Sequence, residues 1–238
     1  MLKRILSPIH EFGVIAGLLY LVDSILRRIS PRFRLFFYEF MVQPIPDKAL
    51  IPPGLAKNLK IREVLVNDPE INEMPVPPEV ISSRFAQGAT CLGIFKNEKF
   101  MGYMWLSFKA YNEDEVRCTF LLTPEDESVF DFDFYIFPEY RMGLAFVGLW
   151  NGANEYLRHM GVKQSYSRLS RFNIESRKSH KHFGWKCLGR AIFVQIWGAE
   201  LMLCTMSPYF NFSARKSGRV RLKLRPDVLI NASSPAKK

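Results

Sequence analysis

Cysteine and histidine are scarce in this chain of 238 residues, which has four of each. No two cysteines have the C-x-x-C spacing, and no cluster of acids and histidines has the spacing of metal ligands. Cys187 and Cys204 stand in apolar, strand-like contexts. The sequence therefore predicts buried free thiols in a reducing compartment, without a disulfide framework and without a metal site.

The chain also lacks a hydrophobic run long enough for a simple transmembrane helix, which needs about 20 residues. An apolar run covers residues 12–22, but Asp23 interrupts it and Arg27-Arg28 closes it. No small-x-small cleavage site follows this run, so a signal peptide is not indicated. We expect residues 1–46 to form a helical segment that lies in the membrane surface with arginines at the headgroups. An ordinary helix packed on the folded body is the alternative.

Acidic residues are few at both ends of the chain. Of the net charge of +10, +4 lies in residues 1–34 and +7 in residues 207–238, which leaves the middle near −1. Basic ends favour phosphates, on lipids or on nucleic acid. The basic stretch 215–225 has no interleaved aromatic and no known nucleic-acid-binding motif, so nucleic acid is not favoured as a partner.

Hydrophobic patterns along the chain predict an α+β fold. Four prolines fall in residues 43–58, of which we assign 47–58 as a linker. The folded body is predicted at 59–206 and a basic tail at 207–238, in which 219–225 adds an edge strand or stays mobile. The predicted strands are 59–66, 91–95, 100–108, 116–122, 129–137, 162–169, 187–197 and 201–205. The predicted helices are 79–87, 143–160 and 174–183.

The most informative pattern lies between residues 137 and 185. A polar strand ends in Pro138-Glu-Tyr-Arg141, and a glycine-containing segment then opens a helix. A second strand leads to a set of spaced positions, which are Asn173, Ser176, His180, Gly184 and Trp185. This order resembles the acyl-CoA-binding half of the GNAT superfamily of N-acyltransferases, and the likeness extends over about residues 59–205. The resemblance implies a mixed, mostly antiparallel sheet flanked by helices, with acyl-CoA or acetyl-CoA as co-substrate.

By this resemblance, the pyrophosphate of the acyl-CoA would bind at Arg141, Met142, Gly143, Leu144 and Ala145. A strand that ends in a tight turn and opens a helix presents free backbone N–H groups and the positive end of the helix dipole. Gly143 would let the backbone approach a phosphate without a Cβ in the way. The family pattern of Arg/Gln-x-x-Gly-x-Gly/Ala is met one residue short, with Tyr140 where Arg or Gln is expected. An ordinary strand-to-helix turn is the alternative.

The resemblance assigns Asn173 and Ser176 to the cofactor and His180 to catalysis. Asn173 would hydrogen-bond the pantetheine or pyrophosphate arm, although asparagine is also a common helix N-cap. His180 stands where the family has a tyrosine that protonates the departing CoA thiolate, and an imidazolium could donate that proton. The alternative is a solvated histidine whose basic neighbours lower its pKa.

Asp131 and Asp133 are the candidate general bases. Strand alternation places both on one face, where an acceptor amine could lie. By the resemblance, a backbone N–H near Ile136 or Phe137 would polarise the thioester carbonyl. A solvated strand end is the alternative for the two acids. The residues predicted to face the core are Phe132, Phe134 and Ile136.

Together these features predict an acyl-CoA N-acyltransferase on the cytoplasmic side of a membrane, peripheral or monotopic, and on the inner membrane if the source is bacterial. Its acceptor would be a primary amine on a lipid or lipid-linked molecule, attacked directly in a ternary complex. Two alternatives stay open. One is a soluble acetyl-CoA-dependent acetyltransferase for a small amine or amino sugar, and the other is a non-catalytic GNAT-like binding protein. The sequence also allows a homodimer.

Overall fold

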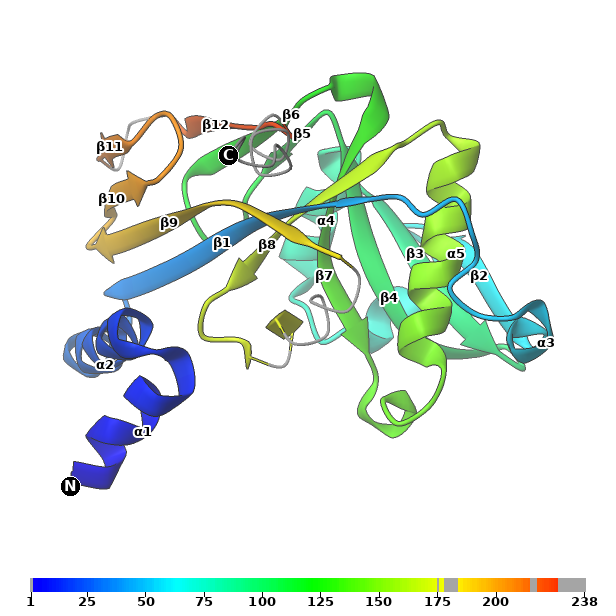
Figure 1. The fold of residues 1–238 in the computed structure, drawn as a ribbon, viewed down its shortest axis with the longest axis horizontal. Coiled ribbons are helices and arrows are strands. Elements are labelled where there is room, and N and C mark those ends of the chain that lie inside the picture. The colour runs from blue at the N-terminus through cyan, green and yellow to red at the C-terminus, as the bar shows by residue number, and fades with distance from the viewer. Residues whose placement is uncertain (1, 175, 178–183, 215–217, 227–238) are drawn as a thin grey trace, which may run out of the picture. The chain divides into compact units, whose positions relative to one another are not determined.

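Figure 1 shows the fold in a computed structural model, which describes residues 2–174, 176–177, 184–214 and 218–226. The chain forms two compact units. The first unit contains residues 1–43, 112–121 and 167–238, and the second contains residues 44–111 and 122–166.

The second unit is built on an antiparallel sheet with the strand order β2-β3-β4-β7. These strands are β2 (Leu59–Val64), β3 (Thr90–Lys96), β4 (Lys99–Phe108) and β7 (Ser128–Ile136). The predicted strands 91–95 and 100–108 pair as the hairpin of β3 and β4, and its turn residues Asn97 and Glu98 have positive φ, as a tight hairpin turn requires. The short strand β5 (Ala110–Asn112) follows β4 across the unit boundary, and β8 (Gln164–Ser170) begins in this unit and ends in the first.

Helices of the second unit are α3 (Pro53–Ala56), α4 (Pro78–Ala86) and α5 (Ala145–His159), with 3₁₀ turns η1 (Pro69–Glu73), η2 (Glu125–Glu127) and η3 (Pro138–Tyr140). Helix α5 lies close against the sheet because its facing residues Gly148 and Gly152 have no side chain. A Cβ at Gly148 would lie 2.7 Å from Leu59 Cδ1, and one at Gly152 would overlap Ile61. This packing fixes where the N-terminus of α5 lies relative to the end of β7.

The first unit has an antiparallel sheet with the strand order β11-β10-β9-β1. Its strands are β1 (Arg34–Pro44), β9 (Lys186–Ile196), β10 (Ala199–Cys204) and β11 (Phe210–Ser213). In a smaller sheet, β12 (Val220–Leu224) lies next to β6 (Cys118–Leu122). The edge strand predicted as one alternative for residues 219–225 is therefore present.

Two helices begin the first unit. α1 (Leu2–Phe12) and α2 (Val14–Ile29) meet at Gly13, whose φ is 85°. One face of α2 packs on β1 through Ala16, Leu35 and Phe37. Asp23 is buried in this contact, where it accepts the Leu35 N–H at 2.9 Å and pairs with Arg27 at 2.7 Å. Asp23, which interrupts the apolar run, thus links α2 to β1 by a buried hydrogen bond.

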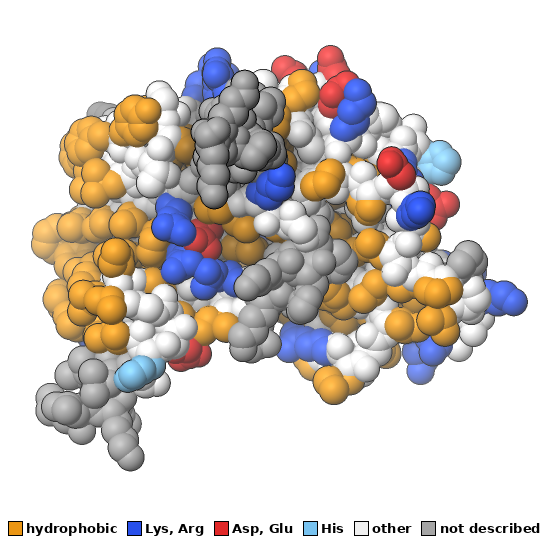
Figure 2. Space-filling model, in the orientation of Figure 1, with side chains coloured by type: hydrophobic (Ala, Val, Ile, Leu, Met, Phe, Trp, Pro, Cys, Tyr) orange, Lys and Arg blue, Asp and Glu red, His pale blue; other side chains and the backbone are white. Residues whose placement is uncertain are grey.

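The opposite face of α2 is apolar and exposed. Its large exposed residues recur at helical spacing and are Val14, Ile15, Leu18, Val22, Ile25 and Ile29. We call these six residues the α2 stripe. Figure 2 shows hydrophobic side chains gathered on the side of the first unit that carries α2, β10 and β11. Within the ranges that the structure describes, none of the helices combines the length and the apolar character needed to cross a membrane.

The prediction of a helical segment over residues 1–46 is wrong for its last part, because residues 34–44 form strand β1, paired with β9. A strand covered on both faces has a nearly continuous apolar run, which a sequence pattern cannot distinguish from a buried helix. The predicted domain boundaries also differ from the compact units, since residue 206 lies inside the first unit.

The α+β class with a mostly antiparallel sheet flanked by helices is confirmed. The elements predicted between residues 59 and 170 are present with ends shifted by a few residues, while β1, β5 and β11 were not predicted. The helix predicted at 174–183 lies mainly outside the described residues, of which Ile174, Ser176 and Arg177 are helical.

The four cysteines are free thiols, but they are not all buried. Cys91 and Cys118 are buried, Cys204 is half-buried and Cys187 is exposed. The prediction is wrong for Cys187 because this residue lies next to the first residue of β9, where the strand is open to solvent.

Candidate active site

The end of β7 and the start of α5 form a tight turn in the second unit. The chain leaves β7 at Ile136 and passes through η3, where Tyr140 N–H donates to Phe137 O at 2.9 Å. Gly143 N–H donates to Tyr140 O at 3.2 Å. Leu144 occupies the N-cap position of α5 and supplies no side-chain hydrogen bond. Because the first N–H groups of a helix have no acceptor within the helix, this turn presents donors together with the positive end of the helix dipole.

A pocket of about 470 Å³ opens at this turn. Four of the five residues predicted to bind pyrophosphate line it, namely Met142, Gly143, Leu144 and Ala145. The charged side chains in its lining are Lys96 and Glu139, whose charges offset each other. An anion in this pocket would therefore depend on the backbone donors of the turn rather than on side-chain charge.

Gly143 is not required by the packing of the turn. A Cβ on this residue would meet only Tyr140 O, at 3.6 Å, which is an ordinary contact. Its φ is also not positive, so the backbone does not demand glycine. An alanine would therefore fit at this position, and the space in front of Gly143 is open toward the pocket.

Arg141 is the one predicted phosphate-binding residue that does not line the pocket. Its Nε donates to Ile136 O at 2.9 Å, and its guanidinium carbon lies 5.4 Å from the centre of the Tyr135 ring. Arg141 therefore ties the turn back to the end of β7.

The backbone of β7 distinguishes the two candidate donors for the thioester carbonyl. Phe137 N–H donates to Met101 O at 3.0 Å and is therefore already paired with β4. Successive strand residues point their N–H and C=O groups to opposite sides, so those of Ile136 point away from β4. The Arg141 contact to Ile136 O agrees with this direction. The prediction of an available N–H is thus wrong for Phe137 and remains for Ile136.

A bulge in β7 separates the two candidate bases. The pairing with β4 shifts between Tyr103 and Trp105, and Asp133 has a φ of 47°. The extra residue on β7 changes the alternation, so the prediction that Asp131 and Asp133 share one face is wrong. Asp131 is 3% exposed and accepts a hydrogen bond from Ser165 Oγ, whereas the Asp133 side chain is 28% exposed.

Predictions for the core face of β7 are met at Phe132 and Ile136, which are buried. Phe134 is half-buried, and its ring stacks on Trp150 of α5 with the ring centres 5.5 Å apart.

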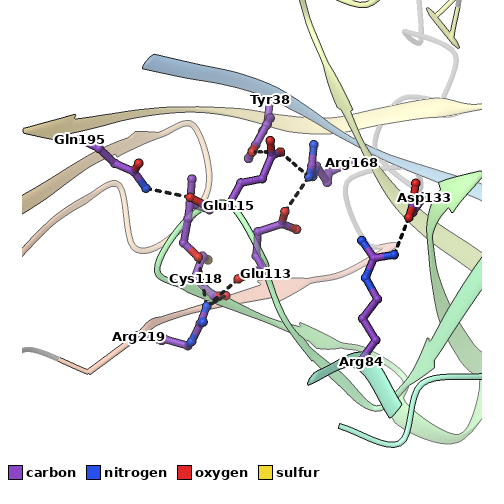
Figure 3. A network of polar contacts seen from close by, with 10 residues as sticks. Tyr38, Arg84, Glu113, Glu115, Cys118, Asp133, Arg168, Gln195 and Arg219 are labelled. Atoms are coloured by element: carbon purple, nitrogen blue, oxygen red, sulfur yellow. Dashed lines mark hydrogen bonds and ion pairs between the residues drawn. The ribbon is translucent and has the colours of Figure 1, made fainter. Parts of the chain in front are cut away.

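Asp133 forms an ion pair with Arg84 from α4, which sequence reasoning missed (Figure 3). Arg84 is buried, and its guanidinium carbon lies 5.4 Å from the Trp105 ring and 5.2 Å from the Phe132 ring. Arg84 is the hydrogen-bond partner of Asp133 Oδ2, and within the described residues Asp133 Oδ1 has no partner. A single arginine in a short amphipathic helix gave no signal of this pairing.

Tyr103 of β4 interacts electrostatically with both Asp133 and Arg84. Burial raises the pKa of its phenol well above the usual value, and the Asp133 carboxylate adds to that rise. Its hydroxyl is buried and has no hydrogen-bond partner in the part of the chain that the structure describes. The candidate catalytic face of β7 is thus bordered by a neutral phenol and a buried guanidinium.

Asn173 and Ser176 belong to the first unit. Asn173 Oδ1 accepts the Ser176 N–H at 3.0 Å, and Asn173 O accepts the Arg177 N–H at 3.2 Å. The alternative of a helix N-cap is therefore confirmed for Asn173, and its role toward a cofactor stays a prediction. Asn173 also lines a pocket of about 330 Å³ that Asp23 and Arg27 of α2 border. His180 lies outside the described residues.

Charged side chains and Tyr38 form a network in the first unit that the sequence did not reveal (Figure 3). Arg168 pairs with Glu113 at 2.6 Å and with Glu115 at 2.7 Å, and Tyr38 donates to Glu115 at 2.8 Å. Arg219 Nη1 donates to Glu113 O at 2.8 Å, which joins the residue before β12 to this network. The network holds residues 113–115 in place. Among the described residues, no group of three or more His, Cys, Asp and Glu could hold a metal ion.

No family profile matches the chain, and no curated protein sequence matches it. Among solved structures, the chain is similar to a conserved protein of unknown function from Staphylococcus epidermidis, with 12% identity, a TM-score of 0.48, and 74% of this chain and 68% of that chain covered. It is also similar to a protein described as an acetyltransferase of the GNAT family from Novosphingobium aromaticivorans, with 12% identity, a TM-score of 0.48, and coverage of 69% and 66%.

A third similar structure is a tandem GNAT protein from the clavulanic acid biosynthesis pathway, with 14% identity, a TM-score of 0.48, and 68% of this chain and 53% of that chain covered. The chain thus spans between about half and two thirds of the length of these three structures. Similarity this distant says nothing of substrate or reaction.

Proposed function

We propose that this protein is an N-acyltransferase that takes its acyl group from acyl-CoA. The observation that carries the proposal is the turn between β7 and α5. There, Gly143 leaves the backbone open toward a pocket of about 470 Å³, at the N-terminus of a helix that no side chain caps. Backbone donors at a helix N-terminus suit a phosphate group, and coenzyme A carries a pyrophosphate.

The proposed reaction is direct attack of a primary amine on the thioester carbonyl carbon in a ternary complex. A C–N bond forms and the C–S bond breaks, while the amine loses a proton and the departing thiolate gains one. Ile136 N–H is the candidate donor to the developing oxyanion, because it points away from β4 and is not used by that pairing. His180 remains the candidate acid for the thiolate.

Asp133 is the better candidate base of the two aspartates. Arg84 holds its Oδ2, and Oδ1 remains for an ammonium or amine group. Asp131 is 3% exposed and engaged with Ser165, so an amine could reach it only after rearrangement of the strand. Proton transfer by a positioned carboxylate contributes about 10²-fold to 10⁴-fold in rate.

Native mass spectrometry of the full chain tests the donor. Acetyl-CoA, palmitoyl-CoA and hydroxymyristoyl-acyl carrier protein are offered in turn, and the retained mass is read. Retention of a CoA thioester, followed by CoA release when an amine is added, supports the proposal and gives the acyl length. Retention of none of the three donors would mean that the turn does not hold CoA, and a binding protein would then be the better hypothesis.

We also propose that the acceptor is a primary amine on a lipid or lipid-linked molecule at a membrane surface, on its cytoplasmic side. The α2 stripe supports this, because an amphipathic helix that buries one face on its own domain can place the other in the lipid interface. Arg27, Arg28 and Arg32 lie exposed or half-exposed at the end of α2, where they could meet anionic headgroups.

A second exposed apolar set lies on strands of the same unit. Trp197 follows β9 and packs on Phe33, with the ring centres 5.1 Å apart, and Leu203 lies on β10. The exposed aromatic residues that follow are Tyr209, Phe210 and Phe212. Together with the α2 stripe they make one side of the first unit richly apolar (Figure 2), and aromatic side chains favour the headgroup level of a bilayer.

Vesicle flotation tests the membrane contact. Removal of residues 1–46 is unsuitable because it deletes β1, so the test is the double substitution Leu18→Glu, Ile25→Glu on the exposed stripe. Each buried side chain of this kind is worth about 1.5–3 kcal/mol, so binding to anionic vesicles should fall at least about tenfold. The matched control is Leu65→Glu, another exposed leucine, in the second unit. Equal vesicle binding of wild type, the double variant and the control would remove the stripe from the membrane proposal. If native mass spectrometry instead shows a dimer that only the double variant loses, the stripe contacts a second copy of the chain.

A further inference from the structure

A group of three arginines surrounds one carboxylate in the first unit. Glu39 of β1 accepts Arg171 Nη1 at 2.8 Å and Arg190 Nε at 3.0 Å on Oε1. Arg177 Nε donates to Oε2 at 3.0 Å. Glu39 and Arg190 are direct partners in the pairing of β1 with β9, whereas Arg171 and Arg177 come from the segment after β8. We call these four residues the Glu39 cluster.

The charges of the Glu39 cluster do not balance. Three guanidinium groups against one carboxylate leave a net charge of +2. Each guanidinium also carries more N–H donors than one shared carboxylate can accept. Arg171 Nε is buried and has no hydrogen-bond partner within the described residues. Positive charge that is partly removed from water in this way is stabilised by an accompanying anion.

The carboxylate of the cluster is buried, whereas the guanidinium groups of Arg177 and Arg190 are partly exposed to solvent. Glu39 is 5% exposed, whereas the side chain of Arg190 is 53% exposed and that of Arg177 is 31% exposed. Burial alone would raise the pKa of the Glu39 carboxyl, but Arg171, Arg177 and Arg190 together hold this pKa below its usual value. The carboxylate thus stays charged, and the surplus positive charge faces outward.

We infer that the Glu39 cluster is a binding site for a phosphate group. Arginine forks match the oxygens of a phosphate and hold it by two parallel hydrogen bonds, which lysines cannot do. A dianion would neutralise the net charge of +2 and give the surplus donors acceptors. The same chemistry is present in the phosphates of coenzyme A and in the headgroup of a phospholipid. The inference goes beyond acyl transfer, because phosphate binding requires neither amine nor thioester.

A nearby thiol can report occupancy of the cluster. Cys187 is exposed and pairs with Met41 in the same strand pair that joins Glu39 to Arg190. Partial desolvation of the Cys187 sulfur and the Glu39 carboxylate raise the pKa of this thiol, while Arg190 and Arg171 oppose the rise, so the thiol responds to the charges of the cluster. A bound anion should slow its alkylation, because it adds negative charge and covers the thiol. A Cys204→Ser background leaves Cys187 as the accessible thiol, since Cys91 and Cys118 are buried.

The experiment measures phosphate binding without turnover. Adenosine 3′,5′-bisphosphate is titrated calorimetrically into the full chain, and Cys187 alkylation is followed at each concentration. A parallel arm uses phosphatidylcholine vesicles with and without phosphatidic acid. Binding of the bisphosphate alone assigns the site to the donor, and a requirement for phosphatidic acid assigns it to a lipid headgroup.

Two substitutions separate a ligand site from an internal ion-pair network. Arg190→Gln should weaken phosphate binding by at least about tenfold, because it removes the most exposed of the three arginines. Glu39→Gln should strengthen binding if the variant folds, because it removes the competing carboxylate. The control is Arg62→Gln, an arginine that Asp68 and Glu70 already neutralise, and it should leave binding unchanged.

A wild-type protein that binds neither probe would overturn the inference, and so would equal binding by wild type and Arg190→Gln. Either result would leave the cluster as a structural ion-pair network. Neither result bears on acyl transfer, which the donor-retention experiment tests by itself.

Discussion

Substitution of Gly143 separates the demands of the fold from those of a ligand. In Gly143→Ala, the added Cβ would lie 3.6 Å from Tyr140 O and would meet nothing closer. The backbone at this residue also needs no positive φ. We therefore expect the free energy of unfolding to stay the same or to rise by up to about 1 kcal/mol, since alanine restricts the unfolded chain more than glycine does.

The expected loss is confined to coenzyme A binding. The same Cβ would stand between the turn and a phosphate that approaches its backbone donors. A hydrogen bond to a charged group is worth about 1.5–3 kcal/mol, so the loss of one such contact should raise the Kd for coenzyme A by about 10-fold to about 100-fold. This ratio is large enough to measure by calorimetry with the free cofactor.

The assay pairs that calorimetric Kd with the Tm from thermal unfolding. Gly218→Ala is the matched control, because a Cβ there also meets nothing within 4 Å, and the residue belongs to the other unit. The control should leave both quantities unchanged. An unchanged Kd in a well-folded Gly143→Ala protein would show that the turn does not hold the phosphate. A fall in Tm would show instead that the packing of the turn is misjudged.

Two further predictions concern the carboxylates. Asp133→Asn should lower kcat at least about 100-fold and leave the Kd for coenzyme A unchanged, which steady-state kinetics and calorimetry would show together; retained kcat would exclude Asp133 as the base. Because the folded-state pKa of the Glu39 carboxyl lies below its unfolded value, its contribution to stability is present above about pH 4.3 and is lost as the pH falls through the folded pKa. Urea unfolding between pH 7 and pH 3 should therefore show a decline at the acidic end that is smaller in Glu39→Gln, and identical profiles would contradict it.

Local patterns in the sequence were sufficient for elements that depend on neighbours in the chain. The hairpin of β3 and β4 was predictable because Lys96-Asn-Glu-Lys99 separates two apolar runs by a short polar turn. Helix α5 was predictable because a turn sequence precedes a long amphipathic stretch. The glycines at 148 and 152 then place this helix close to β2, which no local pattern specified.

Features that depend on distant partners could not be predicted in the same way. Strand β1 is stabilised by β9, which lies far along the chain, and its apolar run alone fits a helix equally well. The bulge at Asp133 is a single extra residue that leaves no mark in the composition of β7. It nevertheless gives Asp131 and Asp133 different surroundings, and the choice of base depends on it.

Charged residues inside apolar runs are the sequence signal that could have revealed the Glu39 cluster. Asp23 and Glu39 each interrupt such a run, and each is buried with arginine partners. Asp23 has one ion-pair partner, Arg27, together with a backbone N–H, so its charge is balanced within the structure. Glu39 has three arginine partners, so its single negative charge leaves an excess of positive charge in the cluster. The fold explains an acid that is matched one to one, such as Asp23, whereas the excess of arginines around Glu39 is the observation from which we propose an anion from outside the chain.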